Sequence, residues 1–378
     1  MNSTCLGFHG VSSSVAASKP FNEKPYFPPK PSVIHNPSFF FQPFSQEPHL
    51  SFSHNANRLK SISKTTTCCY RETFSDFPYK RRGRFIPMGD DDYLVYSYYD
   101  VGTKFKLAVE TGIYETIGID LVAMTLNDII TSGAKPSVMG HLFSSCLLGL
   151  GLCEKVVKGA LEGCEQSDCE FIGGKAINKA DFCATDYELW GSAQGIVKKD
   201  SVIDGKNIVA GDVLVGLPSS VVHWSGFSLV RRALAQSGLS LKDQLPGGSG
   251  KPITFGEALM TPTVIYVKQV LDIISKGGVK GIAHITGGGL TDDIPGVFQE
   301  GLGATIYQDS WEVPAVFKWI QEAGRIEDAE MRRTFNMGIG MVLVVNPDAA
   351  ARILGEQRGG YSAYLIGEVT SREGVTYQ

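Results

Sequence analysis

A stripe of apolar residues at helical spacing is the first strong pattern in the chain, and it predicts a helix over 121–132. Asp120 is placed to cap the start of this helix. At about 100° per residue, Asp120, Asn127 and Asp128 fall together on the face opposite the stripe. This polar face is either a solvated surface or part of a functional site. The stripe consists of Val122, Leu126, Ile129 and Ile130, and the helix is ended by Gly133 and Pro136.

In the second half of the chain, short apolar runs alternate with helical patterns. One helical pattern begins at Ser225 and stops at Gly238, where glycine favours a helix end. A second begins with Thr261 and Pro262, an N-cap followed by proline in the first turn, and continues to Gly277. Strands and helices in alternation are typical of mixed α/β layers. The apolar runs predict strands over 212–217, 281–285, 339–345 and 364–369.

Residues 1–69 differ in composition from the rest of the chain. They are rich in Ser, Pro, Phe and Asn, and their only acids are Glu23 and Glu47, against six lysines and arginines. This composition is typical of an organellar transit peptide, with plain disorder as the alternative. Because arginine is scarce and no basic amphipathic helix is evident at the start, the chloroplast is favoured, with the mitochondrion as the alternative.

Length and charge narrow the class of protein. A chain of 378 residues with 43% hydrophobic content can fill more than one core, because single cores stop growing near roughly 250 residues. We therefore expect two domains, 70–205 and 206–378. A net charge of −4 provides no broad positive field, so nucleic acid is not an expected partner. No apolar run approaches the roughly 18 residues of a membrane span, so no membrane association is expected. The eight cysteines show no Cys-x-x-Cys pattern of a metal site.

A run of three glycines directly after the predicted strand 281–285 suggests phosphate binding. Phosphate oxygens need several backbone N–H donors at close range, and glycine permits that approach. A flexible turn is the alternative. His284 lies inside the strand, where it is either a packed core histidine or a catalytic one. The candidate phosphate-binding residues are Thr286, Gly287, Gly288 and Gly289.

The segment 100–104 offers a second candidate site. Asp100 supplies a carboxylate for a hard cation, Gly102 permits close approach of a ligand, and Lys104 supplies charge for a phosphate. A tight turn is the alternative, and the chain contains neither a P-loop nor a dinucleotide-binding glycine pattern. If the fold brings Asp100 and Asp128 together, they would share a Mg²⁺ ion that retains some of its waters.

His223 is a third candidate. It lies in the loop between the predicted strand 212–217 and the next helix, where free N–H groups and the helix dipole favour an anion. A histidine there is either simply solvated or able to protonate or orient a substrate.

Several longer motifs, in this order along the chain, resemble phosphoribosylformylglycinamidine cyclo-ligases, also called aminoimidazole ribonucleotide synthetases. The resemblance covers about residues 85–378 and rests on several long motifs rather than one short pattern. The motifs, beside the three candidate segments, are Gly118–Met124, Asn127-Asp128, Phe227–Arg231, Thr261–Thr263 and Arg333–Met341.

The resemblance implies a fold and a reaction. The fold is a two-domain α/β architecture in which the N-terminal domains of two subunits join their sheets into a barrel, and the C-terminal domain is mixed α/β. The reaction uses ATP and Mg²⁺ to activate the formyl oxygen of formylglycinamidine ribonucleotide, after which an amidine nitrogen closes the imidazole ring. The expected partners are therefore this small-molecule substrate and a second copy of the chain.

The resemblance also implies roles for particular residues. His223 and His284 would be catalytic, and Asp100 and Asp128 would bind the metal ion. The residues implied to bind ATP or its phosphates are Asp100, Gly102, Thr103, Lys104, Asn127, Thr286, Gly287, Gly288 and Gly289.

The chain departs from the family pattern at chemically important positions. One glycine is missing before Val101, His141 stands where the family has an aspartate, and Lys175 stands where it has a glutamate. The segment that helps to cover ATP has no counterpart between Tyr70 and Asp92. A weakened or inactive relative that dimerises or binds nucleotide is therefore the alternative, with a kinase of the same superfamily as a weaker one.

Overall fold

The computed structural model describes residues 84–145, 150–178, 187–246, 252–356 and 362–378. The predicted transit peptide lies outside the described residues. The described residues belong to one compact unit. Among the described helices, none combines the length and apolar character that crossing a membrane requires.

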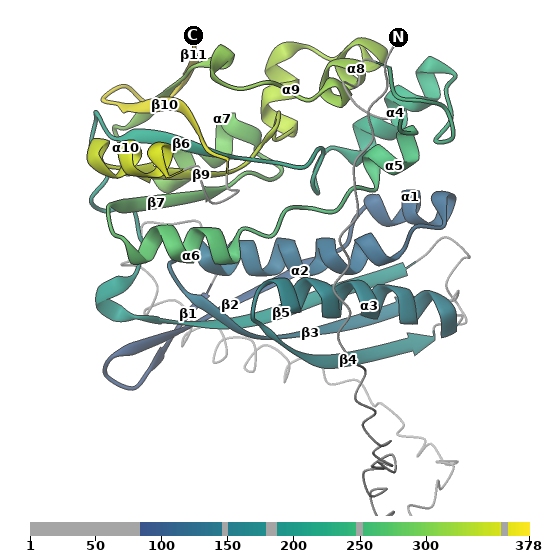
Figure 1. Ribbon diagram of the computed structural model, residues 1–378, viewed down its shortest axis with the longest axis horizontal. Coiled ribbons are helices and arrows are strands. Elements are labelled where there is room, and N and C mark those ends of the chain that lie inside the picture. The colour runs from purple at the N-terminus through teal and green to yellow at the C-terminus, as the bar shows by residue number, and fades with distance from the viewer. Residues whose placement is uncertain (1–83, 146–149, 179–186, 247–251, 357–361) are drawn as a thin grey trace, which may run out of the picture. The chain divides into compact units, whose positions relative to one another are not determined.

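The described part of the chain before residue 199 forms a sheet with helices on one face (Figure 1). Its elements are β1 (Arg84–Met88), β2 (Asp92–Asp100), α1 (Lys104–Thr111), α2 (Glu115–Ile130), β3 (Lys135–Ser145), α3 (Leu150–Gln166), β4 (Glu170–Asn178) and β5 (Tyr187–Lys198). The strand order is β1-β2-β5-β3-β4. β3 and β4 run parallel, and the other neighbouring strands run antiparallel. We call this the N-terminal sheet.

Helices α2 and α3 touch through glycines. A Cβ atom at Gly118 would lie 2.0 Å from the carbonyl oxygen of Val156, and one at Gly159 would lie 1.8 Å from that of Glu115. The two backbones therefore approach more closely than any side chain allows. Because α2 is packed between α3, the sheet and α6, most of its residues are buried, and these include polar ones.

The second part of the described chain forms a six-stranded sheet with helices around it. Its elements are η1 (Lys199–Ser201), β6 (Val213–Pro218), α4 (Phe227–Ser237), α5 (Phe255–Leu259), α6 (Val267–Ser275), β7 (Val279–His284), α7 (Gly289–Asp293), η2 (Pro295–Val297), β8 (Gly303–Ile306), η3 (Gln308–Ser310), α8 (Ala315–Gly324), α9 (Asp328–Thr334), β9 (Ile339–Val345), α10 (Pro347–Gly355), β10 (Tyr364–Thr370) and β11 (Gly374–Tyr377). The strand order is β11-β8-β10-β6-β9-β7. Only β11 and β8 run parallel among these described pairs.

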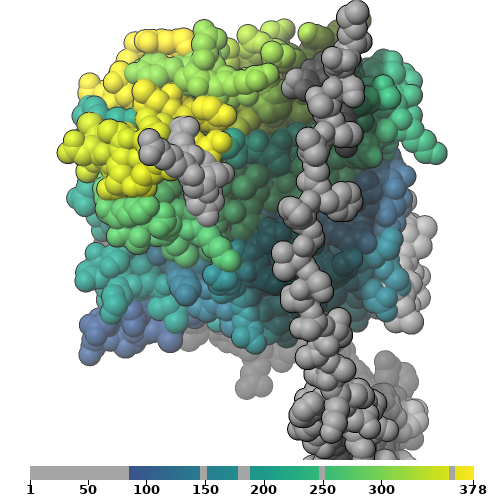
Figure 2. All heavy atoms as spheres, in the orientation of Figure 1, coloured from purple at the N-terminus to yellow at the C-terminus, as the bar shows by residue number. Residues whose placement is uncertain are grey.

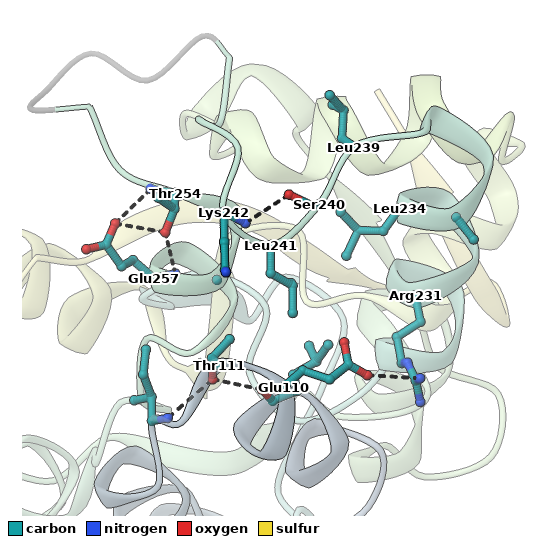
Figure 3. Close-up of a pocket in the computed structure, with 14 residues that line it drawn as sticks. Glu110, Thr111, Arg231, Leu234, Leu239, Ser240, Leu241, Lys242, Thr254 and Glu257 are labelled. Atoms are coloured by element: carbon teal, nitrogen blue, oxygen red, sulfur yellow. Dashed lines mark hydrogen bonds and ion pairs between the residues drawn. The ribbon is translucent and has the colours of Figure 1, made fainter.

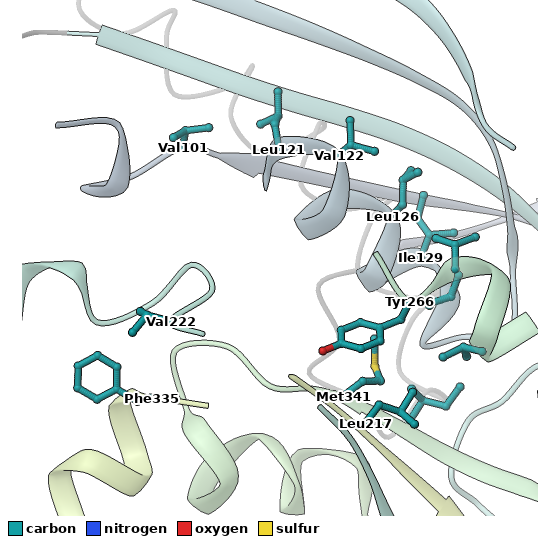
Figure 4. Packing of buried hydrophobic residues seen from close by; sticks show 14 of the residues in the cluster. Val101, Leu121, Val122, Leu126, Ile129, Leu217, Val222, Tyr266, Phe335 and Met341 are labelled. Atoms are coloured by element: carbon teal, nitrogen blue, oxygen red, sulfur yellow. The ribbon is translucent and has the colours of Figure 1, made fainter. Parts of the chain in front are cut away.

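Both faces of this second sheet are buried, because alternate residues of its central strand enter two hydrophobic clusters. Met341 and Leu343 of β9 belong to one cluster, and Val342 and Val344 belong to the other. The first cluster continues into α2. Tyr266 lies between the α2 side chains Leu126 and Ile129 and the sheet side chains Leu217 and Met341 (Figure 4). In the space-filling view, green side chains of α6 lie between those of yellow α10 and the teal segments below (Figure 2).

The four predicted strands of the second half are confirmed as β6, β7, β9 and β10, with ends shifted by at most two residues. The short strands β8 and β11 were not predicted. The helix from Ser225 is confirmed as α4, and Gly238 ends it in the left-handed conformation.

Two helix starts were predicted wrongly. Helix α2 begins at Glu115, so Asp120 lies inside the helix rather than at its cap. The helix predicted from Thr261 begins only at Val267. The intervening residues stay outside the helix because side chains of α2 bind their backbone, a tertiary interaction that local start signals do not contain.

Candidate functional site

A pocket between the C-terminal end of α2 and the β7–α7 turn brings several predicted residues together. It has a volume of about 290 Å³ and receives side chains from β2, α2, β7 and α7. Three of the residues predicted from the sequence line it, together with two acids that the sequence analysis did not predict. These five residues are Asp128, His284, Thr286, Asp292 and Asp293.

The acids of this pocket are fixed by neighbouring donors. The Ser97 hydroxyl on β2 donates to Asp128 Oδ2 at 3.0 Å. The Thr286 backbone N–H donates to Asp293 Oδ2 at 2.6 Å, which ties the end of β7 to α7. Carboxylates are the ligands that Mg²⁺ prefers, and Mg²⁺ is usually held by one or two of them plus waters and phosphates. Among the described residues, no three potential ligands are grouped closely enough to hold an ion by themselves.

Asp292 and Asp293 were missed because two adjacent acids after a glycine turn are common. The available signal was the position of Asp292 in the first turn of a helix directly behind the predicted phosphate-binding run, with Asp293 next to it.

The three consecutive glycines differ in their structural surroundings. Gly289 has φ +56°, and a Cβ there would lie 2.1 Å from the carbonyl oxygen of Arg332. A Cβ at Gly288 would meet Asp293 Oδ1 at 2.6 Å. At Gly287 a Cβ would meet only Ser225 Oγ, at 3.4 Å. Packing therefore accounts for Gly288 and Gly289, and Gly287 faces the loop that carries His223.

His223 is buried, with 3% of its surface exposed. Its Nε2 accepts hydrogen bonds from the backbone N–H groups of Ser220, at 3.2 Å, and Val264, at 3.5 Å. Within the described part of the chain, its Nδ1 has no hydrogen-bond partner. Burial lowers the pKa of His223 well below its usual value, and His284 and Lys104 lower it further. A Cβ at Gly340 would lie 2.5 Å from the ring, so the glycine of that motif makes room for His223.

Lys104 does not reach this pocket. Its ammonium group lies 2.8 Å from Asp120 Oδ2 and donates to the Thr261 carbonyl oxygen at 2.9 Å. Both side chains of the pair are essentially unexposed, at 1% and 0%. Burial lowers the pKa of Lys104 and raises that of Asp120, and the opposite charge of each partner offsets part of that shift.

Asn127 is also turned inward. Its amide nitrogen donates to the Val264 carbonyl oxygen at 2.8 Å, and its amide oxygen accepts from the Tyr266 N–H at 2.9 Å. Asn127 and Lys104 were predicted to bind ATP, but in this structure both bind protein groups, because α2 and the start of α1 turn them into the interior.

The segment 100–104 is divided between two sides of the N-terminal sheet. Ser97 of β2 faces Asp128, and residues three apart on a strand point to opposite faces, so Asp100 lies on the outer face. The structure therefore does not bring Asp100 and Asp128 to one metal ion. Gly102 is half-buried beside Thr103, whose hydroxyl lies 3.4 Å from that of Ser228 at the start of α4.

Two of the larger pockets lie away from these residues. One, of about 770 Å³, lies between α1, α4 and α5, and Arg231 and Glu110 form an ion pair at its rim (Figure 3). The other, of about 510 Å³, lies on the outer face of the N-terminal sheet. It is lined by Tyr98, Trp190 and His141, which stacks on Phe171 with ring centres 5.5 Å apart.

Comparisons with protein families match both parts of the chain. Residues 84–197 match the N-terminal domain of AIR synthase related proteins, and residues 209–378 match the C-terminal domain. The prediction of a two-domain α/β fold of this type is confirmed.

Curated relatives carry a consistent name. The chain is 65% identical over 298 residues to a chloroplastic phosphoribosylformylglycinamidine cyclo-ligase of Arabidopsis thaliana, covering 78% of this chain and 76% of the relative. It is 65% identical over 296 residues to a chloroplastic/mitochondrial protein of that name from Vigna unguiculata, covering 78% and 75%. A Sorangium cellulosum protein of the same name is 43% identical over 283 residues, covering 74% and 80%.

Solved structures agree at the level of the fold. A thiamine-monophosphate kinase from Stenotrophomonas maltophilia matches with a TM-score of 0.58 and 18% identity, over 79% of this chain and 92% of that one. The structure titled "AaThiL complexed with AMPPCP and TMP" matches with a TM-score of 0.57 and 16% identity, over 86% and 96%. At such identities the likeness concerns architecture alone. Together with the relatives, the two family matches show that this chain belongs to the phosphoribosylformylglycinamidine cyclo-ligase family.

Proposed function

We propose that this protein closes the imidazole ring of formylglycinamidine ribonucleotide, using ATP and Mg²⁺ and releasing aminoimidazole ribonucleotide, ADP and phosphate. The observation that carries the proposal is family membership at 65% identity over 76% of a relative that bears the cyclo-ligase name. The shared name supports an active cyclo-ligase over a weakened or inactive relative that only dimerises or binds nucleotide. The likeness to thiamine-monophosphate kinase, at 18% identity, concerns the fold only.

Nucleotide complexes of structural neighbours support the use of ATP. Proteins of similar fold were solved with AMPPCP and, for T. maritima PurL, with ADP. When bound, ATP supplies the phosphoryl group that turns the formyl oxygen into a leaving group. For this chain we assign phosphate contacts to Gly287 and to the backbone of the 101–103 loop beside α4, because these segments converge on Ser225 and Ser228.

The pocket residues carry the proposed chemistry. His284 lies on the pocket wall at the end of β7, and we take it and His223 as the catalytic residues, which would hold or move a proton during ring closure. Asp128 would hold the metal ion, with Asp292 or Asp293 across the pocket. Charge developing on the transferred group would then be neutralised by the ion, because Lys104 is engaged elsewhere.

The outer face of the N-terminal sheet suits a second copy of the chain. It exposes large apolar side chains, including Tyr98 at 47%, Trp190 at 39% and Ile172 at 67%. A continuous exposed apolar sheet face is a typical interaction surface. We therefore propose a homodimer in which two such sheets form a barrel, and we retain domains 70–205 and 206–378, a division supported by the two family matches.

The relatives also support the predicted location. The Arabidopsis thaliana protein is named chloroplastic and the Vigna unguiculata protein chloroplastic/mitochondrial. Localisation to the chloroplast, with the mitochondrion as a second destination, is therefore the expected one for this chain.

The decisive experiment combines growth and turnover. The chain should restore growth of a bacterial purine auxotroph that lacks its own cyclo-ligase. The purified protein should convert formylglycinamidine ribonucleotide and ATP into aminoimidazole ribonucleotide and ADP in a Mg²⁺-dependent assay. His284→Gln is the matched control and should fail in both. Soluble protein that neither restores growth nor closes the ring would rule out the proposal.

A further inference from the structure

The segment 261–266, which lies outside any helix or strand, is bound along its length by side chains of α2 and α1. Asp120 Oδ1 accepts from both the N–H and the hydroxyl of Thr263, at 2.7 and 2.6 Å. Asn127, two turns further along α2, holds Val264 and Tyr266 by one hydrogen bond each. Lys104 holds the Thr261 carbonyl oxygen. A segment with a strong helix start signal is thereby kept out of the helix.

We propose that Lys104, Asp120 and Asn127 form a buried brace that positions His223, and that none of the three contacts nucleotide. The inference rests on the proposed function only for the role of His223. The brace itself is argued from contacts within the chain.

The link to His223 is a backbone donor. The Asn127 amide donates to the carbonyl oxygen of Val264, and Asp120 accepts from the N–H of the preceding residue, Thr263. The peptide on each side of Val264 is therefore fixed. The Val264 N–H then points at Nε2 of His223, and the Ser220 N–H adds a second donor to the same nitrogen. Because Nε2 accepts, the single proton of a neutral ring must sit on Nδ1.

The ring is also held from its other side. The Tyr266 hydroxyl donates to the Pro218 carbonyl oxygen at 2.7 Å, which ties the brace segment to the strand that leads to the His223 loop. The ring centres of Tyr266 and His223 lie 6.3 Å apart. Thus the brace sets both the orientation and the tautomer of His223, leaving Nδ1–H as its one donor.

Burial separates this role from nucleotide binding. An ammonium group that neutralises phosphate must be reachable, but Lys104 is 1% exposed, is paired at 2.8 Å and lies over the Phe227 ring at 5.6 Å. Breaking a buried pair leaves an uncompensated charge, which costs far more than replacing both partners together. Replacing only Lys104 or only Asp120 should therefore destabilise the folded protein more than replacing both.

The first test uses Lys104→Met, Asp120→Asn and the double variant. Each single variant should lose most of its soluble, folded protein, and the double variant should regain it. In the double variant kcat should fall about tenfold while KM for ATP stays within about twofold, because a positioning contact is lost rather than a binding one. Lys106→Met, the same substitution at an exposed lysine of α1, is the matched control and should match the wild type.

A tenfold rise in KM for ATP in the folded double variant would overturn the brace and restore Lys104 as a nucleotide ligand. Single variants that are as stable as the double variant would overturn it as well.

The second test uses the wild-type chain, so it does not depend on whether variants of Lys104, Asp120 or Asn127 fold. Nitrogen-15 NMR of the imidazoles in the wild-type chain reports which nitrogen carries the proton, and His223→Gln identifies the His223 signals by their loss. We expect a neutral ring protonated on Nδ1. A ring protonated on Nε2, or a charged ring at pH 7, would refute the proposal. Neither this spectrum nor the stability comparison requires substrate, so an inactive wild type would refute the proposed function and leave the brace standing.

Discussion

Two neighbouring residues of α2, Asn127 and Asp128, belong to regions with opposite chemistry. Asn127 joins the brace with Lys104 and Asp120, where every charge is paired and almost nothing is exposed. Asp128 faces the pocket with His284 and Asp293, where acids gather around a space of about 290 Å³. One step along a helix rotates a side chain by about 100°, which is enough to move it from one region to the other.

The comparison shows that polar residues of one motif need not share one task. The brace contributes through interactions that are complete within the chain, so its loss should first affect folding. The pocket leaves acids facing a space where a ligand fits, so its loss should first affect turnover. Four predictions test this separation.

The largest expected effect is that of Asp120→Ala. This change leaves the Lys104 ammonium buried without its partner and removes the acceptor for the Thr263 N–H. Loss of one partner of a buried pair costs about 3–5 kcal/mol. Urea unfolding followed by circular dichroism should show this loss, or the protein should not accumulate in soluble form. If the unfolding free energy fell by less than about 1 kcal/mol, the Lys104–Asp120 pair would contribute no more than an exposed ion pair, and the prediction would be wrong.

Asp128→Asn should have the second largest effect, on activity instead of folding. The substitution keeps the shape and the hydrogen bond from Ser97 but removes charge from the pocket. We expect kcat to fall about 100-fold, roughly 2.7 kcal/mol in barrier height, with a higher Mg²⁺ concentration needed for half-maximal rate. Unfolding free energy should be nearly unchanged. Wild-type turnover and Mg²⁺ dependence in this variant would remove Asp128 from the proposed metal site.

The third prediction concerns pH and His223. Because its pKa is lowered in the folded chain, the unfolded chain binds a proton near pH 6.5 that the folded chain does not. The free energy of unfolding should therefore fall as pH drops below about 6.5, by up to about 1.4 kcal/mol per pH unit for this one group. After burial, the groups that lower the pKa of His223 are His284 and Lys104, through their charge. Denaturant midpoints between pH 7.5 and 5.5 measure the slope.

His223→Gln should reduce that slope, because the group that titrates differently is gone. Burial also lowers the pKa of His141, so His141→Gln serves as an independent comparison on the other side of the sheet. Slopes equal to that of the wild type in the His223→Gln variant would contradict a buried neutral His223.

The smallest effect is expected for Glu110→Gln at the rim of the larger pocket (Figure 3). Glu110 pairs with Arg231 at 3.1 Å, but these side chains are 46% and 39% exposed. Exposed pairs contribute about 0–1 kcal/mol, so the unfolding free energy should change by less than about 1 kcal/mol. A larger loss would mean that burial does not explain the contrast with the Lys104–Asp120 pair. Salt titration of both variants would sharpen the same comparison, since screening acts mainly on exposed pairs.

Much of the fold could be predicted from the order of residues. The strand 339–345 is buried on both faces, so an unbroken apolar run identifies it without knowledge of its neighbours. Helix α4 carries its own end signal in Gly238. The strand β11 escaped prediction because it is short, half-exposed and stabilised mainly by pairing with β8.

The site could be predicted only as a set of residues. His284 and Thr286 could be placed beside each other because they are two residues apart at the end of one strand. Asp128 could not be placed against them, because α2 and β7 meet only in the folded chain. The expected pairing of Asp100 with Asp128 failed because side-chain direction on β2 depends on the sheet face that α2 covers.

By itself, then, the sequence determined the family, the α/β elements and most of the polar residues that matter, since motifs and periodicity are local properties. Only the tertiary structure decided which of those residues face a ligand pocket and which are buried and bonded to other groups of the protein. The physical reason is desolvation: a buried charge must find its partner within the chain, so the packing of α2 commits Lys104 to Asp120 and leaves Asp128 for the pocket.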